Sequence, residues 1–193
     1  HPAYANKHVF ARNDRELVCA SLAAAQSVQT PTAPVVKAKA LSDFESNPAL
    51  GLAFSPDGKM LAAATWQGLV KVIDLATGKE MAAPKPHNDW VCAVAFSPDG
   101  KLLISAGGSE FKPERNKGKT TGQVKLWDMA ASKELGELSG HTNKVFSATF
   151  SLDNKTVATG SADQTVRLWD PTTREQRALL EGHTGAVWCV AFS

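Results

Sequence analysis

Residues 140–170 contain the side-chain types of a nucleophilic catalytic triad. His141 follows Gly140, and the segment SADQTVRLWD at 161–170 adds a serine and an aspartate beside an alternating apolar pattern. A base, an acid that orients it and a hydroxyl nucleophile are the components of acyl transfer. Such a site also needs an exposed nucleophile and an oxyanion-stabilising group, and the sequence offers a motif for neither. The sequence therefore predicts no catalytic residue.

The composition sets further bounds on function. The chain has 193 residues, of which 43% are hydrophobic and 21% charged, as in ordinary soluble domains. Its net charge of +2 is too small to indicate a nucleic-acid or membrane surface, and no apolar run reaches the roughly 18 residues of a membrane span. No cofactor motif or metal-ligand spacing occurs. Three sparse cysteines favour reduced thiols, so we expect a cytoplasmic protein.

The same residue types recur at fixed spacing along the chain. Apolar runs end in a phenylalanine at Phe54, Phe96, Phe150 and Phe192, separated by 42, 54 and 42 residues. Each of three histidines lies 13 residues after an aspartate and nine before the next phenylalanine; they are His87, His141 and His183. The extra 12 residues of the long interval lie between Phe96 and Asp128. A repeat of this length and regularity predicts a stack of similar units.

Each unit is predicted to hold four short strands. Alternating and β-branched residues favour strands, and the segments SPDGK and SLDNK suit tight hairpins between the first two. A fainter first unit is indicated by FARNDRELVCAS at 10–21, which aligns without gaps to FSPDGKMLAAAT at 54–65. Four-stranded units of about 40–45 residues point to a β-propeller.

On these residues the sequence resembles the WD40-repeat family. The motifs that carry the resemblance are SGH at 139–141, EGH at 181–183, KLWD at 125–128 and RLWD at 167–170. It implies an all-β fold of WD40 propeller blades, each a four-stranded antiparallel sheet, in an incomplete ring. The ring would be completed by missing blades of the same chain or by self-association. The predicted units are a tail with a degenerate blade at 1–46, blades at 47–88, 89–142 and 143–184, and the first strand of a following blade at 185–193.

The resemblance also implies that the triad-like residues form a structural tetrad of hydrogen bonds. In the unit at 143–184 the tetrad would be His141, Thr159, Asp163 and Trp169. Buried imidazole, hydroxyl and indole groups each need a partner. In the preceding unit a partial tetrad would join His87, Ser105 and Trp127, with Thr121 at the aspartate position. The unit at 47–86 has Ala63, Gln67 and Ile73 at the matching positions, which predicts apolar packing instead.

Two tryptophans indicate a partner-binding face. Trp66 and Trp90 lie in or beside connectors that strand alternation places on one face, where sister repeats carry small or charged residues. Tryptophan is enriched at binding hot spots, and WD40 proteins commonly bind partners on this face. The alternative is that either tryptophan packs under its neighbouring loop, and the sequence does not decide between the two.

The 12-residue insertion enters a connector on the same face, within 107–122. Phe111 could anchor a partner, and basic residues such as Lys112 could meet an acidic one; Lys144, aligned with Trp90, completes the predicted partner-binding set. The alternative is a merely solvated loop.

The sequence thus favours a non-catalytic protein–protein interaction scaffold that binds a protein or peptide, with neither nucleic acid nor membrane as a partner. One alternative is a module fused to a signalling enzyme such as a bacterial protein kinase. A propeller enzyme with its site near the central channel ranks last, because the innermost strands, such as VCAVAF at 91–96, are apolar.

Overall fold

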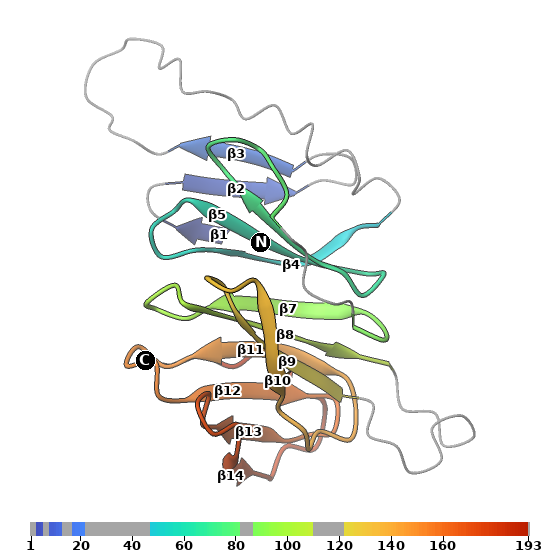
Figure 1. The fold of residues 1–193 in the computed structure, drawn as a ribbon. Helices are drawn as coiled ribbons and strands as arrows, with labels where there is room; N and C mark the ends of the chain where they lie inside the picture. The colour runs from blue at the N-terminus through green and yellow to red at the C-terminus, as the bar shows by residue number, and fades with distance from the viewer. Residues whose placement is uncertain are drawn as a thin grey trace.

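The computed structural model of the chain consists of β-strands joined by turns and connectors (Figure 1). It describes residues 3–5, 8–12 and 17–21, and then 47–81, 87–109 and 122–192. The strands are β1 (Ala3–Ala5), β2 (His8–Arg12), β3 (Leu17–Ser21), β4 (Ala49–Phe54), β5 (Met60–Thr65), β6 (Val70–Asp74), β7 (Val91–Phe96), β8 (Leu102–Gly108), β9 (Gly122–Asp128), β10 (Lys133–Glu137), β11 (Val145–Phe150), β12 (Val157–Ser161), β13 (Val166–Trp169) and β14 (Gln176–Leu180).

The strands form four antiparallel sheets in chain order. Sheet 1 contains β1–β3, sheet 2 β4–β6, sheet 3 β7–β10 and sheet 4 β11–β14, and within each sheet every strand pairs with the next along the chain. Sheets 2, 3 and 4 follow one another as layers in an open stack (Figure 1). The predicted all-β class of antiparallel blades in an incomplete ring is confirmed.

A serine–aspartate pair closes the first hairpin of sheets 2, 3 and 4. In sheet 2 the Ser55 hydroxyl donates to Asp57 Oδ1 at 2.6 Å and accepts from the Met60 amide at 2.9 Å. The equivalent pairs, Ser97–Asp99 and Ser151–Asp153, lie at 2.7 and 2.6 Å. The residue after the aspartate has a positive φ, which favours glycine or asparagine; it is Gly58, Gly100 or Asn154. The hairpin segments of the repeat therefore encode these turns.

Apolar residues fill the spaces between neighbouring sheets. Between sheets 2 and 3 the buried cluster contains Ala62, Ala64, Val70, Val72, Val91, Val94, Phe96, Leu103 and Trp127. Between sheets 3 and 4 it contains Ile104, Ala106, Val124, Leu126, Leu138, Val145, Ala148, Phe150, Val157 and Trp169. Because side chains alternate across a strand, each sheet contributes one set to the sheet before it and another to the sheet after it. Burial of this kind contributes about 1.5–3 kcal/mol for each large apolar side chain.

The early units differ in detail from the later ones. Sheet 2 has three strands among the described residues, and an isolated bridge between Ile73 and Glu80 stands where a fourth strand is predicted. The gapless alignment places Phe10 opposite Leu17, as Phe54 is opposite Leu61, but β2 and β3 pair Phe10 with Cys19. In that alignment Ala11 stands at the position of Ser55, so the first unit lacks the serine that closes the later hairpins.

The boundaries between units stay predictions. Sheets 2, 3 and 4 lie within 47–88, 89–142 and 143–184. Residues 185–192 pair with no strand of the described chain, although the Val187 amide donates to the Ser161 carbonyl at 2.9 Å. A first strand pairs with the second strand of its own sheet, so the assignment of this segment to a further blade stays a prediction.

Candidate functional site

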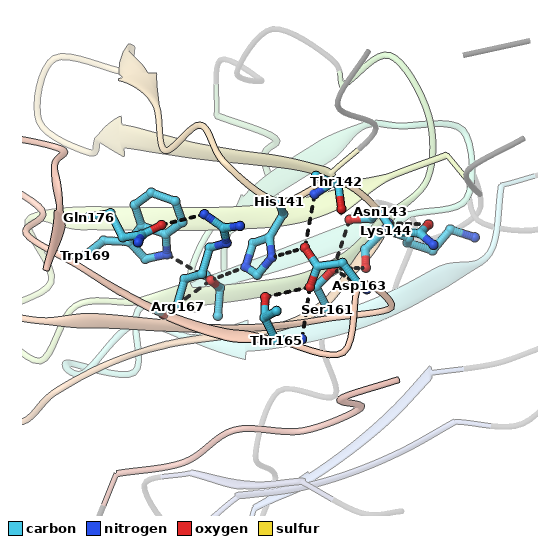
Figure 2. Close-up of polar contacts among 11 residues, drawn as sticks. His141, Thr142, Asn143, Lys144, Ser161, Asp163, Thr165, Arg167, Trp169 and Gln176 are labelled. Atoms are coloured by element: carbon cyan, nitrogen blue, oxygen red, sulfur yellow. Dashed lines mark hydrogen bonds and ion pairs between the residues drawn. The ribbon is translucent and has the colours of Figure 1, made fainter. Parts of the chain in front are cut away.

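The structure brings the four predicted tetrad residues of sheet 4 together. His141 precedes β11, Thr159 lies in β12, Asp163 lies in the turn after β12, and Trp169 ends β13. His141 Nδ1 is 2.8 Å from Asp163 Oδ2, and His141 Nε2 is 2.7 Å from Thr159 Oγ1. The Trp169 indole N–H donates to Thr159 Oγ1 at 2.8 Å. Figure 2 shows His141 between the aspartate and the indole.

These bonds form a chain with one consistent direction of donation. The indole donates to the Thr159 oxygen, so we assign the Thr159 hydroxyl as donor to His141 Nε2 and His141 Nδ1–H as donor to Asp163. This assignment makes the imidazole neutral. Burial lowers the pKa of His141 below its ordinary value of 6.5, although Asp163 acts in the opposite direction.

Asp163 has further donors besides the histidine. It accepts from the Thr142 amide at 3.0 Å, the Thr165 amide at 3.0 Å and the Thr165 hydroxyl at 2.6 Å (Figure 2). Burial alone would raise the pKa of Asp163, but the hydrogen bonds from Thr165 and His141 outweigh it, and the pKa lies below its ordinary value. Since Thr159 and His141 are both 0% exposed, the arrangement holds connectors to strands and presents no accessible nucleophile.

In sheet 3 the partial tetrad is also assembled. His87 Nε2 lies 2.6 Å from the Ser105 hydroxyl oxygen, which accepts from the Trp127 indole at 2.8 Å. His87 Nδ1 has no hydrogen-bond partner among the described residues, and Thr121, at the aspartate position, lies outside them. Burial, with a smaller effect of the Lys125 ammonium, lowers the pKa of His87 to about 3. In the part of sheet 3 that the structure describes, the histidine is therefore neutral and has no carboxylate partner.

Gln123 accepts a hydrogen bond that the aspartate accepts in sheet 4, and the sequence did not predict this role. Its Oε1 accepts from the Asn88 amide at 2.9 Å, as Asp163 accepts from the equivalent Thr142 amide. Gln123 aligns with Thr165 and not with Asp163, so spacing alone points to the wrong position. In sheet 2, Ala63 and Ile73 are buried as predicted from their apolar side chains.

A second constellation joins the predicted partner-binding residues Trp66, Trp90 and Lys144, which we call the tryptophan stack. Trp66 follows β5, Trp90 precedes β7 and Lys144 precedes β11, so three sheets contribute. The two indole rings lie with centroids 3.9 Å apart and planes tilted by 35°. Lys144 Nζ lies 3.8 Å from the centroid of the Trp90 ring.

The backbone positions the tryptophan stack. The Trp66 amide donates to the Pro48 carbonyl at 3.0 Å, and the Gly108 amide donates to the Trp90 carbonyl at 2.9 Å. These equivalent bonds fix the end of each second strand against the connector that begins its sheet. A β-carbon on Gly107 would lie 1.9 Å from the Trp90 carbonyl oxygen, so this approach requires glycine.

Exposure distinguishes the members of the tryptophan stack. Trp66 is 46% exposed, whereas Lys144 is 9% exposed and Trp90 is half-buried. Lys144 therefore serves within the stack, and Trp66 presents the largest surface to solvent. The predicted residues Phe111 and Lys112 lie outside the described residues.

A further aromatic pair was not predicted. Phe146, in β11, stacks on Trp188 with ring centroids 4.1 Å apart and planes at 21°. Trp188 is 69% exposed. The sequence could have indicated this pair, because the two aromatic residues occupy the same position of consecutive repeats, 42 residues apart.

In the described ranges, no cluster of three or more histidine, cysteine, aspartate or glutamate side chains could hold a metal. Nor does that part of the chain contain a helix long and apolar enough to cross a membrane.

Comparisons with known proteins match this repeat. A family model described as WD domain, G-beta repeat matches residues 78–128, 132–170 and 174–193, together more than half of the chain. A model described as Anaphase-promoting complex subunit 4 WD40 domain matches residues 10–99. The uncharacterized WD repeat-containing protein alr3466 of Nostoc sp. (strain PCC 7120 / SAG 25.82 / UTEX 2576) is 50% identical over 42 residues. That match covers 22% of this chain and 3% of the relative's length.

Proposed function

The chain belongs to the WD40-repeat family, and from that premise we propose that it is a non-catalytic scaffold that binds a protein or peptide through the tryptophan stack. The observation that carries the proposal is the meeting of Trp66, Trp90 and Lys144 from three sheets, with Trp66 46% exposed. Tryptophan anchors contribute strongly to binding when a partner excludes water from them.

The alternative for each tryptophan was packing under its own loop. Trp90 is half-buried, but its neighbours are the ring of Trp66 and the ammonium group of Lys144, which come from other sheets. Trp66 retains nearly half of its surface. This arrangement supports a contact surface that is held rigid before the partner arrives, which lowers the entropic cost of binding.

Two further aspects are proposals of the same kind. We propose a cytoplasmic location, which is supported by the free thiols of Cys92 and Cys189. Fusion to a signalling enzyme remains the alternative function, but no described residue favours it over the scaffold.

The proposed function is tested by partner capture with matched variants. Proteins retained from a lysate by the wild type are compared with those retained by Trp66→Ala/Trp90→Ala and by Leu152→Ala. Leu152 is 78% exposed in the turn after β11, at the opposite ends of the strands, and is the control. We expect the double variant to lose a captured protein that the control retains, with an affinity loss of at least about 2 kcal/mol for the purified pair. Equal capture by all three proteins would remove the tryptophan stack from the account.

A further inference from the structure

We propose that Trp66 receives a neutral ring of the partner, an aromatic or proline side chain, and does not receive a lysine or arginine. The inference rests on the proposed function, because it names the chemistry that the tryptophan stack selects.

The geometry leaves room for one more ring. Trp90 lies against Trp66 with centroids 3.9 Å apart, so it covers one face of the Trp66 indole, yet 46% of the residue stays exposed. Aromatic rings pair in offset or tilted arrangements, and the 35° tilt of the existing pair is one of these. A partner ring on the free face would extend the stack in the same way.

Trp66 lies beside the start of β4. Its amide is held by the Pro48 carbonyl at 3.0 Å, directly before β4. Ala49 of β4 pairs with Thr65, the residue before Trp66, and the next residue, Leu50, is 38% exposed. A neutral ring placed on the exposed Trp66 would remove apolar area of both rings from water, which favours binding.

The cation of the stack is supplied from within the chain. Lys144 Nζ lies 3.8 Å from the centroid of Trp90 and is largely buried. Asp89 lies on the connector that carries Trp90, and its carboxylate accepts from the Trp90 amide at 2.8 Å. The stack therefore already contains one group of each charge. Because cation–π attraction at an exposed indole is small, a neutral ring is the better occupant.

The test is a selection from a phage-displayed library of random 12-residue peptides on the immobilised protein. Clones that also bind Trp66→Ala are removed, and dissociation constants of synthetic consensus peptides are measured by calorimetry. The comparison includes Trp66→Phe, which keeps a ring, and circular dichroism establishes that each variant is folded. We expect an aromatic or proline residue in the consensus. Its replacement by alanine and the Trp66→Ala change should each weaken binding at least tenfold, and Trp66→Phe should weaken it less.

The contradicting results separate the two proposals. A consensus of lysine or arginine whose binding depends on Trp66 would overturn the neutral-ring inference and leave the proposed face intact. Peptides that bind Trp66→Ala/Trp90→Ala as well as the wild type, or a selection that enriches nothing, would count against both.

Discussion

The tetrad around His141 and the tryptophan stack are built on the same kind of connector, yet their environments are opposite. Both join a residue just before a first strand to a residue just after a second strand. In the tetrad every polar group is used and His141 is 0% exposed, whereas in the stack Trp66 is 46% exposed. A site whose hydrogen bonds are all satisfied internally stabilises the fold, and one that leaves a large rigid side chain exposed can bind a partner.

Gly107 positions the tryptophan stack, and its substitution should have the largest effect. In Gly107→Ala the new β-carbon would lie 1.9 Å from the Trp90 carbonyl oxygen, so the backbone that carries Trp90 must move. We expect a loss of about 4 kcal/mol in the free energy of unfolding, together with weaker partner binding. Urea denaturation measures the first and calorimetry the second. Wild-type values for both would mean that this approach is looser than described.

Removal of the central hydroxyl should affect stability alone. Thr159→Val leaves the Trp169 indole N–H and His141 Nε2 buried without their partner. Each such group costs about 1–3 kcal/mol, so we expect a loss of about 3 kcal/mol by urea denaturation. The matched control is Thr184→Val, at an exposed position, which should change little. If the two variants lose the same amount, the tetrad does not stabilise the fold.

Acid should weaken the fold through the buried histidines. Above pH 6.5 the imidazole of His87 is neutral in the folded and unfolded chains alike. Below pH 6.5, His87 binds a proton in the unfolded chain but stays neutral in the folded chain, because its pKa in the fold is about 3. The free energy of unfolding should then fall by up to about 1.4 kcal/mol per pH unit for each such histidine.

The free energy of unfolding measured at pH 7.5 and at pH 5.0 tests this dependence. The interval stops at pH 5.0 because most aspartates take up protons only at lower pH. An NMR titration should find His87 still neutral at pH 5. Protonation of His87 near pH 6.5 would show that it is not held as described.

The smallest effect on stability is expected for Trp66→Ala. It removes one aromatic pair at a half-exposed position, which corresponds to about 1 kcal/mol. The near-ultraviolet circular dichroism of the coupled indoles should fall sharply although the fold remains. An unchanged spectrum would indicate that the two rings are apart in solution.

The repeat register predicted the strands, and the resemblance to the WD40-repeat family implied the tetrad. Phenylalanine, aspartate and histidine at constant spacing fix the strands, and a residue's place on a strand fixes its neighbours across the sheet. The match of His141 with Trp169, which lie 28 residues apart, came from the family resemblance applied to this register.

The spacing of the repeat did not predict contacts between side chains of different units. Trp66 and Trp90 were assigned to one face, but their stacking follows from rotamers that no repeat pattern encodes. The bond from Asn88 to Gln123 was missed for the same reason, since a long amide side chain reaches it from a different position.

The division of roles between the tetrad and the tryptophan stack is tested most directly with the consensus peptide selected on the wild-type protein. Its affinity is measured for Thr159→Val and for Trp66→Ala, at a temperature where both variants are folded. We predict that Thr159→Val, although the less stable protein, binds within twofold of the wild type, and that Trp66→Ala binds at least tenfold more weakly. Normal binding by Trp66→Ala together with lost binding by Thr159→Val would contradict the division between the tetrad that stabilises the fold and the stack that binds.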